Sequence, residues 1–185
     1  MIRVRAALDR IPNYVPGKSA ESVASEHALE RAIKLASNEV PYPPTPAVLA
    51  AIAEAAASAH RYPDDNSGEL RAALAARHGL RDDEVIVAGG SVTMCSQFIL
   101  ATCDAGDEVL YGWPSFEAYP ILAMQVGATA RTAPLRDETY DLDAMADLLN
   151  DRTRCIFVCT PNNPTGTAVT REAVCLLYTS PSPRD

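Results

Sequence analysis

The sequence predicts an α/β fold in which crossover helices join the strands of a parallel-rich sheet. The first observation is alternation: from residue 85 onwards, short apolar runs with β-branched residues alternate with longer stretches of helical pattern. Strands that alternate with helices form parallel sheets, and their crossovers are right-handed by default. The second observation is composition, because 48% hydrophobic and 22% charged residues allow a chain of 185 residues to bury a core.

The first part of the chain is predicted to lie outside that sheet. Residues 1–36 are expected to be an irregular arm, because Pro12, Pro16 and Gly17 prevent a long helix. The stretch 37–46 has four prolines in ten residues and must be a loop.

Two helices are predicted next. One spans 47–59, with Pro46 in its first turn and Thr45 as its cap. After the turn-rich loop RYPDDNSG, an amphipathic helix at 69–78 is expected to end at Gly79.

The remaining elements alternate between strand and helix. Buried strands are expected at 85–88, 108–111, 128–132 and 155–159. Helices are expected at 91–101, 115–126 and 142–149, and a further helix is expected to begin near Thr170.

Composition excludes several classes of function. A net charge of -8, from 16 basic and 24 acidic residues, disfavours nucleic-acid binding, which depends on Lys and Arg. No apolar run reaches the roughly 20 residues of a membrane span, so a cytoplasmic protein is expected. The five cysteines form no CxxC pair and are accompanied by three histidines, so no metal site is predicted. Cys155 and Cys159 are interpreted as small buried hydrophobes in a reducing compartment.

The last residues, Cys175 to Asp185, break the alternation. Pro181 and Pro183 end the helix that begins near Thr170. Translated backwards, CLLYTSPSPRD matches one reading frame of a transposase-based sequencing adapter, so we expect native sequence to end near Val174. An ordinary disordered tail is the alternative. The expected organisation is therefore an arm and small-domain segment at 1–45, a partial large domain at 46–174, and a segment at 175–185 that is not native.

Glycines stand where the first predicted strand meets a helix. The strand at 85–88 is followed by Gly89, Gly90, Ser91 and Val92. Such a turn can direct backbone N–H groups and the positive end of a helix dipole at a phosphate. Many strand-to-helix turns carry glycine for structural reasons alone. The pattern is not GxGxxG, so a dinucleotide fold is less favoured.

Two more loops follow predicted strands. Phe116, in GWPSF, could stack on a planar ring at the carboxyl end of a strand, or could belong to the core stripe of its helix. In TPNNPTG, at 160–166, prolines restrict the backbone, so an asparagine could donate a directed hydrogen bond to an anionic oxygen. A surface turn is the alternative interpretation of that heptad.

These motifs resemble those of the fold-type I transferases that use pyridoxal 5'-phosphate (PLP). The chain resembles the histidinol-phosphate aminotransferase family, in a form close to the actinobacterial aromatic amino acid aminotransferases. The resemblance is carried, in the family's order, by KLASNEVPYPP, RYPDDNSGELRAALA, VAGGSVTMCSQ, GDEVLYGWPSFEAYP and CIFVCTPNNPTG. Many members have Asp-Glu after the phosphate turn, where this chain has Val92-Thr93.

The resemblance implies a role for individual residues. Gly90, Ser91 and Val92 match the turn that holds the PLP phosphate, Phe116 matches the aromatic that stacks on the pyridine ring, and Asn163 matches the asparagine that bonds the phenolic oxygen.

Three residues of the first 62 also match the family. Tyr62 matches a tyrosine that reaches the neighbouring subunit's cofactor phosphate, so a homodimer is implied. Asn38 and Tyr14 match residues near the substrate.

The resemblance also implies what this chain lacks. The family's Schiff-base lysine, the aspartate at the ring nitrogen and the arginine for the substrate carboxylate all follow the position of Asn163. The two lysines of this chain, Lys18 and Lys34, do not match the first of these, so we expect the chain itself to be inactive. The intact parent would transfer an amino group from glutamate to imidazole acetol phosphate or to aromatic 2-oxo acids. A PLP-dependent decarboxylase acting on threonine phosphate and a noncatalytic phosphate-binding α/β module remain as alternatives.

Overall fold

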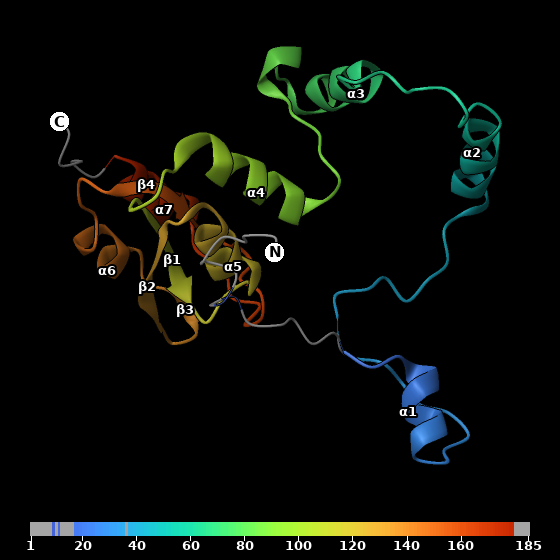
Figure 1. The fold of residues 1–185 in the computed structure, drawn as a ribbon, viewed down its shortest axis with the longest axis horizontal. Coiled ribbons are helices and arrows are strands. Elements are labelled where there is room, and N and C mark those ends of the chain that lie inside the picture. Colours follow the sequence, from blue (N-terminus) through green and yellow to red (C-terminus); the bar gives the residue numbers. More distant parts are fainter. Residues whose placement is uncertain (1–8, 10, 12–16, 36, 180–185) are drawn as a thin grey trace, which may run out of the picture. The chain divides into compact units, whose positions relative to one another are not determined.

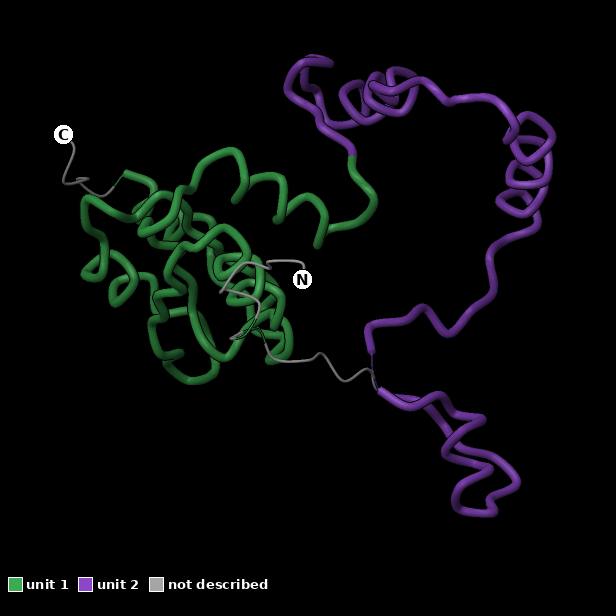
Figure 2. The backbone as a smooth tube through the Cα atoms, in the orientation of Figure 1, with its two compact units in different colours: residues 1–12, 88–185 green, residues 13–87 purple. Residues whose placement is uncertain are grey.

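The computed structural model describes residues 9, 11, 17–35 and 37–179. The chain divides into two compact units, one of residues 13–87 and one of residues 88–185 with 1–12 (Figure 2). Each unit has its own internal contacts and is described by itself. The predicted boundary between residues 45 and 46 and the predicted origin of 175–185 stay predictions. None of the helices in the described part of the chain is long and apolar enough to cross a membrane.

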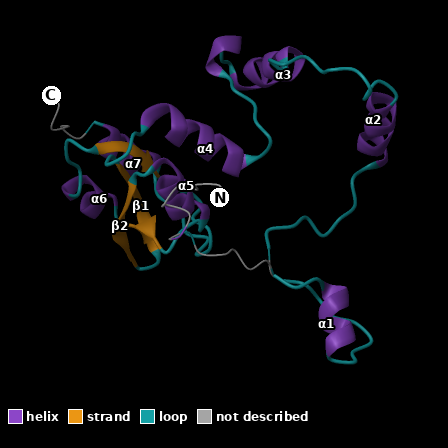
Figure 3. Ribbon diagram, in the orientation of Figure 1, coloured by secondary structure: helices purple, strands orange, loops and turns teal. Residues whose placement is uncertain are grey.

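The unit of residues 13–87 contains short helices and no strand among its described residues (Figure 3). Its helices are α1 (Ala20–Glu26), α2 (Pro46–Ala56), α3 (Gly68–His78) and the 3-10 turn η2 (Asp82–Glu84).

Helix α1 corrects the expectation that 1–36 is irregular. The Ser19 hydroxyl accepts a hydrogen bond from the Ser22 amide at 3.1 Å, and this cap permits a two-turn helix beyond Gly17. The two predicted helices of this unit are confirmed, and α3 ends at Gly79 in the left-handed conformation (φ 67°).

The unit of residues 88–185 is built around a four-stranded sheet (Figure 1). Its strands are β1 (Glu108–Trp113), β2 (Thr129–Arg136), β3 (Thr139–Tyr140) and β4 (Thr153–Phe157), in the order β3-β2-β1-β4. Its helices are α4 (Ser91–Thr102), α5 (Ala118–Val126), α6 (Leu142–Asp147) and α7 (Arg171–Tyr178).

The strand directions confirm the parallel-rich sheet. Strand β1 is parallel to both β2 and β4, whereas β3 pairs antiparallel with β2 as a short hairpin. Helix α5 connects β1 with β2, and α6 precedes β4, as crossover connections require. Helix α5 begins at Ala118 rather than at Ser115, because Ser115 is held in a loop by side-chain hydrogen bonds described below.

The predicted strand at 85–88 is wrong. These residues are not paired with any described strand, and Ile86 is 69% exposed. A strand exists only where a neighbour takes its backbone hydrogen bonds, and an apolar run by itself does not supply that neighbour.

The core lies on both faces of the sheet. On one face, Val109 and Tyr111 of β1 pack in a cluster with residues of α4 and α5. On the other face, Leu110 packs in a second cluster with residues of α6 and α7. Alternate residues of one strand therefore point into two different hydrophobic layers, which is why β1 is apolar almost throughout.

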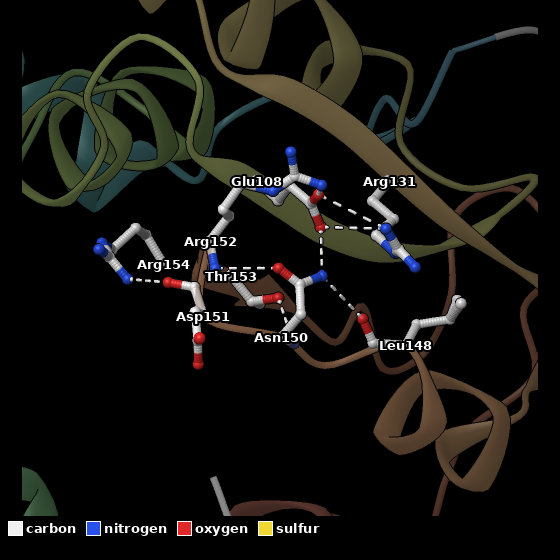
Figure 4. Close-up of polar contacts among 8 residues, drawn as sticks. All are labelled: Glu108, Arg131, Leu148, Asn150, Asp151, Arg152, Thr153 and Arg154. Atoms are coloured by element: carbon white, nitrogen blue, oxygen red, sulfur yellow. Dashed lines mark hydrogen bonds and ion pairs between the residues drawn. The ribbon is translucent and has the colours of Figure 1, made fainter. Parts of the chain in front are cut away.

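A charged cluster occupies the amino end of β1 (Figure 4). Glu108 is 3% exposed, and its carboxylate forms an ion pair with Arg152 at 2.7 Å and accepts hydrogen bonds from the Asn150 side-chain amide at 2.8 Å and from Arg131 at 3.3 Å. These contacts bind the ends of β1, β2 and β4 to one another. The cluster lies at the opposite end of the strand from the loops that carry the candidate site.

Candidate active site

The loops after β1 and β4 lie at the same edge of the sheet. The two strands are adjacent and parallel, so their carboxyl ends meet there. The loop after β1 contains Ser115 and Phe116, and the loop after β4 contains Asn162 and Asn163. In open α/β sheets, this edge is where ligands bind.

Buried side chains join these two loops. Ser115 and Asn162 are each 3% exposed, and the Ser115 hydroxyl donates to Asn162 Oδ1 at 2.8 Å. The Tyr140 hydroxyl donates to Ser115 Oγ at 2.7 Å. Asn162 Nδ2 donates to the Pro114 carbonyl at 3.2 Å. Three segments far apart in the sequence thus share one satisfied polar cluster.

The loop after β4 is also closed upon itself. The Asn162 backbone N–H donates to the Thr167 backbone carbonyl at 2.7 Å, and the Gly166 backbone N–H donates to the Asn162 backbone carbonyl at 2.7 Å. Gly166 has φ 74°, a conformation that favours glycine. Asn162 Nδ2 also donates to Thr165 Oγ1 at 2.9 Å. Asn163 lies within this closed loop and is half-buried.

Phe116 is half-buried against the core. Its ring meets the Tyr119 ring edge to face, with centroids 5.5 Å apart, and Tyr119 stacks on Phe157 at 4.5 Å. Burial, with Cys159 close by, raises the pKa of the Tyr119 phenol, so this aromatic cluster is uncharged at neutral pH. Phe116 therefore belongs to the core on one side and is partly open on the other, which agrees with both interpretations of GWPSF.

The start of α4 offers unpaired backbone donors. Gly90 precedes the helix with φ 94°, and Ser91 and Val92 are exposed. The first-turn amides of any helix have no intrahelical partner, and no side chain of the described residues caps this one. The Thr93 hydroxyl donates to the Gly89 carbonyl at 3.0 Å and stabilises the turn.

This helix start lies towards the same edge as the two loops. Helix α4 ends just before β1 begins, so its C-terminus lies near the amino end of that strand, and its other end is placed by the packing of Cys95. Cys95, one turn beyond Ser91, packs in the same cluster as Phe116 and Cys159.

The residues present fit a phosphorylated ring compound. Unpaired amides at a helix N-terminus bind phosphate, and a β-carbon at Gly90 would meet no atom within 4 Å, so the turn is open to an approaching anion. Phe116 supplies an aromatic face, and Asn163 supplies an amide. The structure therefore places the Gly90 turn, Phe116 and Asn163 towards one edge of one sheet, and their roles towards a ligand stay predictions.

The other predicted site residues are not brought to this edge. Tyr62, whose side chain is fully exposed, and Asn38, also exposed, belong to the unit of residues 13–87. Tyr14 lies outside the described residues. Their assignments to a neighbouring cofactor and to the substrate stay predictions.

Three polar residues at this edge were missed by sequence reasoning. Ser115 and Asn162 lie inside motifs that were singled out for their neighbours, Phe116 and Asn163. Each has a polar side chain directly after a buried strand, which is a usable signal for a buried hydrogen bond. Tyr140 gave no such signal, because it reaches the site through a two-residue strand that the sequence pattern does not reveal.

The cysteines were predicted to be small buried hydrophobes and not metal ligands. Among the described residues, no group of three or more His, Cys, Asp and Glu side chains is arranged to hold a metal ion. Cys155 is buried, and burial raises the pKa of its thiol to about 12. Cys159 is only half-buried.

Comparison with known proteins gives the family. Residues 30–181 match the family described as aminotransferase class I and II. The chain is 50% identical over 171 residues to the aromatic amino acid aminotransferase of Corynebacterium efficiens, covering 91% of this chain and 47% of that protein. It is 51% identical over 174 residues to the protein of the same name from Nocardia farcinica, covering 93% and 46%. The chain thus spans about half the length of the curated relatives it matches.

Solved structures show the same fold. The structure of histidinol-phosphate aminotransferase from Sinorhizobium meliloti in complex with pyridoxal-5'-phosphate matches with a TM-score of 0.84 and 22% identity, covering 97% of this chain and 48% of that one. N-succinyldiaminopimelate aminotransferase from Mycobacterium tuberculosis matches with a TM-score of 0.73 and 26% identity, covering 85% and 44%.

The fold and the site thus define an α/β chain of the fold-type I transferases, a class whose aminotransferases depend on PLP. Within that class, the chain belongs to the family of class I and II aminotransferases. The resemblance found in its motifs is thereby confirmed at the level of the family.

Proposed function

We propose that this chain is part of a PLP-dependent aminotransferase that exchanges an amino group between glutamate and aromatic 2-oxo acids, or between glutamate and imidazole acetol phosphate. The observation that carries the proposal is the pair of loops bound together by Ser115 and Asn162, with Cys95 of α4 packed in the same cluster as Phe116. The names of the curated relatives favour aromatic substrates.

Each residue of the site has a task in this proposal. The amides of Ser91 and Val92 would bind the cofactor phosphate, with the helix dipole adding positive potential, and Gly90, whose own amide donates to the Ala88 carbonyl at 2.8 Å, would form the open turn before them. Phe116 packs against one face of the ring, and the Asn163 amide donates to its phenolic oxygen. When bound, PLP supplies an electron sink for the electron pair left on the substrate's α-carbon.

The chain by itself has no candidate for the family's lysine. Its two lysines lie in the unit of residues 13–87, where Lys18 pairs with Glu26 and Lys34 pairs with Glu39. We therefore propose that the 185-residue chain binds cofactor without turning over, and that the intact parent is the active cytoplasmic homodimer. Tyr62 would then serve the neighbouring subunit's phosphate.

The test compares the chain with its parent. The parent, expressed from its complete reading frame, is expected to convert phenylalanine and 2-oxoglutarate to phenylpyruvate and glutamate. The ratio of its kcat/KM for phenylalanine to its kcat/KM for histidinol phosphate then decides the substrate class. The 185-residue chain, treated with PLP and borohydride, is expected to carry no cofactor on Lys18 or Lys34 by peptide mass spectrometry. A parent that decarboxylates threonine phosphate and transaminates none of these substrates would contradict the proposal.

A further inference from the structure

The site contains a run of hydrogen bonds with a single direction. Each hydroxyl has one hydrogen, so each can donate once. Tyr140 donates to Ser115, and Ser115 donates to Asn162 Oδ1. Asn162 Nδ2 then donates to Thr165 Oγ1, 2.9 Å away.

The end of the run fixes its direction. The Thr167 hydroxyl donates to the Glu138 carbonyl at 2.7 Å, which uses its hydrogen. The contact between the Thr165 and Thr167 hydroxyls, at 2.9 Å, must therefore take its hydrogen from Thr165. Every donor of the run is then occupied, and Tyr140 is the residue at which it begins.

The fold is arranged to hold Tyr140 at this place. Asp137 and Glu138 are both left-handed, with φ 48° and 59°, and form the tight turn that brings β3 back along β2. The Tyr140 ring lies against Gly112 of β1, where an added β-carbon would be 3.0 Å from two ring atoms. Tyr140 is 5% exposed, so water cannot replace its hydroxyl as the donor to Ser115.

We propose that Tyr140 is a positioning residue for the cofactor site, whose hydroxyl orders the loops of Phe116 and Asn163 through Ser115 and Asn162. Ser115 precedes Phe116 directly, and Asn162 precedes Asn163 directly, so each buried polar residue sets the place of the neighbour that would meet the ring. This inference rests on the proposed function. It gives the first asparagine of TPNNPTG the task of ordering the loop and leaves the ligand contact to the second.

The test removes the hydroxyl and keeps the ring. Tyr140→Phe is compared with Tyr111→Phe, which removes a hydroxyl from a tyrosine that is 1% exposed in the same sheet and lies outside this run of hydrogen bonds. The probe is pyridoxamine 5'-phosphate, which has the phosphate, ring and phenolic oxygen but no aldehyde to react with lysines. Its binding to the 185-residue chain is followed by the fluorescence of Trp113, the only tryptophan. Hydrogen exchange of the peptide covering 160–168 is measured without ligand.

Tyr140→Phe is expected to weaken binding of pyridoxamine 5'-phosphate about 10-fold and to speed amide exchange at 160–168 by a similar factor. Tyr111→Phe is expected to change both by less than about twofold. Ser115→Ala interrupts the same run one step later and should reproduce both effects, which keeps the test decisive if Tyr140→Phe does not fold.

Equal affinity in Tyr140→Phe and the unaltered chain would overturn the inference, since the run would then be structural only. Weaker binding without faster exchange would also overturn it, as would equal effects of Tyr111→Phe. An unaltered chain that does not bind the probe at all would refute the cofactor site assigned to this chain, and the positioning role with it. The failure of the inference alone is thus distinguishable from the failure of the proposed function.

Discussion

Strand β1 has a buried polar cluster at each end, and the two differ in kind. At its amino end, the charged cluster consists of Glu108 with Arg131, Arg152 and Asn150 (Figure 4). At its carboxyl end, the neutral cluster consists of Ser115, Asn162 and Tyr140. The first joins strands, and the second joins loops.

The difference teaches how a sheet can carry a site at one end only. A buried carboxylate is stable only with charged partners, which bind the strands but also create a strong local field. A neutral network has little field of its own. We therefore expect the unpaired amides of α4 to supply positive potential at the carboxyl edge, where an anionic ligand is proposed to bind.

Removing the charge at the amino end should have the largest effect on stability. Glu108→Gln leaves two arginines beside a buried neutral amide, although Arg152 is 67% exposed and can regain water. We expect a loss of about 2–3 kcal/mol in the free energy of unfolding, below the value for a fully buried pair. Urea denaturation measures it.

Asp83→Asn is the control for that prediction. It breaks an ion pair with Arg81 in which both side chains are 71% exposed, and should cost less than about 0.5 kcal/mol. Equal losses in the two variants would show that the amino-end cluster is no more than a surface ion pair.

Filling Gly112 should disturb the carboxyl end next most strongly. In Gly112→Ala, the new methyl group meets the Tyr140 ring and Leu135 Cδ2 at 3.0 Å, so the ring must move. Because the added methyl group overpacks the site, the free energy of unfolding is expected to fall by about 1–2 kcal/mol. Thermal unfolding gives the stability, and acrylamide quenching of Trp113 reports the loop.

Gly89→Ala serves as the matched substitution for stability. Its β-carbon would have only Thr93 Oγ1 within 4.0 Å, so the free energy of unfolding of this variant should lie within about 0.5 kcal/mol of that of the unaltered chain. A Gly112→Ala chain that is as stable as Gly89→Ala would mean that the Tyr140 ring is not confined.

The sequence predicted the sheet well because periodicity reports burial. Strands β1, β2 and β4 and every helix of the unit of residues 88–185 were expected close to where they lie, since two-sided burial makes β1 apolar and glycine ends α5 at Gly127. The wrong strand at 85–88 had the same apolar pattern. Pairing is a property of a neighbour, which the local sequence does not contain.

Motifs pointed to candidate site residues, but not to the hydrogen bonds that connect their loops. Asn163 and Phe116 were singled out because their motifs stand after strands, and their roles stay predictions. Tyr140 was missed because its role depends on a hairpin turn at Asp137 and on the absence of a side chain at Gly112. Such a role appears only when three separate segments are placed together in space.

The smallest expected effect is on the pH dependence of the free energy of unfolding, which should respond to the buried tyrosines and not to the charged cluster at the amino end of β1. Burial raises the pKa of Tyr111 to about 12 and also raises the pKa of Tyr140, for which burial is again the largest cause. A raised pKa means that the folded chain holds a proton that the unfolded chain has released. The stabilisation is therefore complete below about pH 10, the unfolded value, and is lost as pH rises towards 12.

From pH 9 to pH 11, Tyr111 alone should reduce the free energy of unfolding by about 1 kcal/mol, and urea denaturation at each pH should show this loss removed in Tyr111→Phe. Cys155, whose pKa is also raised to about 12, acts in the same direction, as do Tyr140 and Tyr119, so part of the slope remains in that variant. Glu108→Gln should leave the alkaline slope unchanged, because its cluster contains no tyrosine or cysteine. A slope that follows Glu108 instead of the tyrosines would mean that the two ends of β1 are coupled through the strand and do not act as separate clusters.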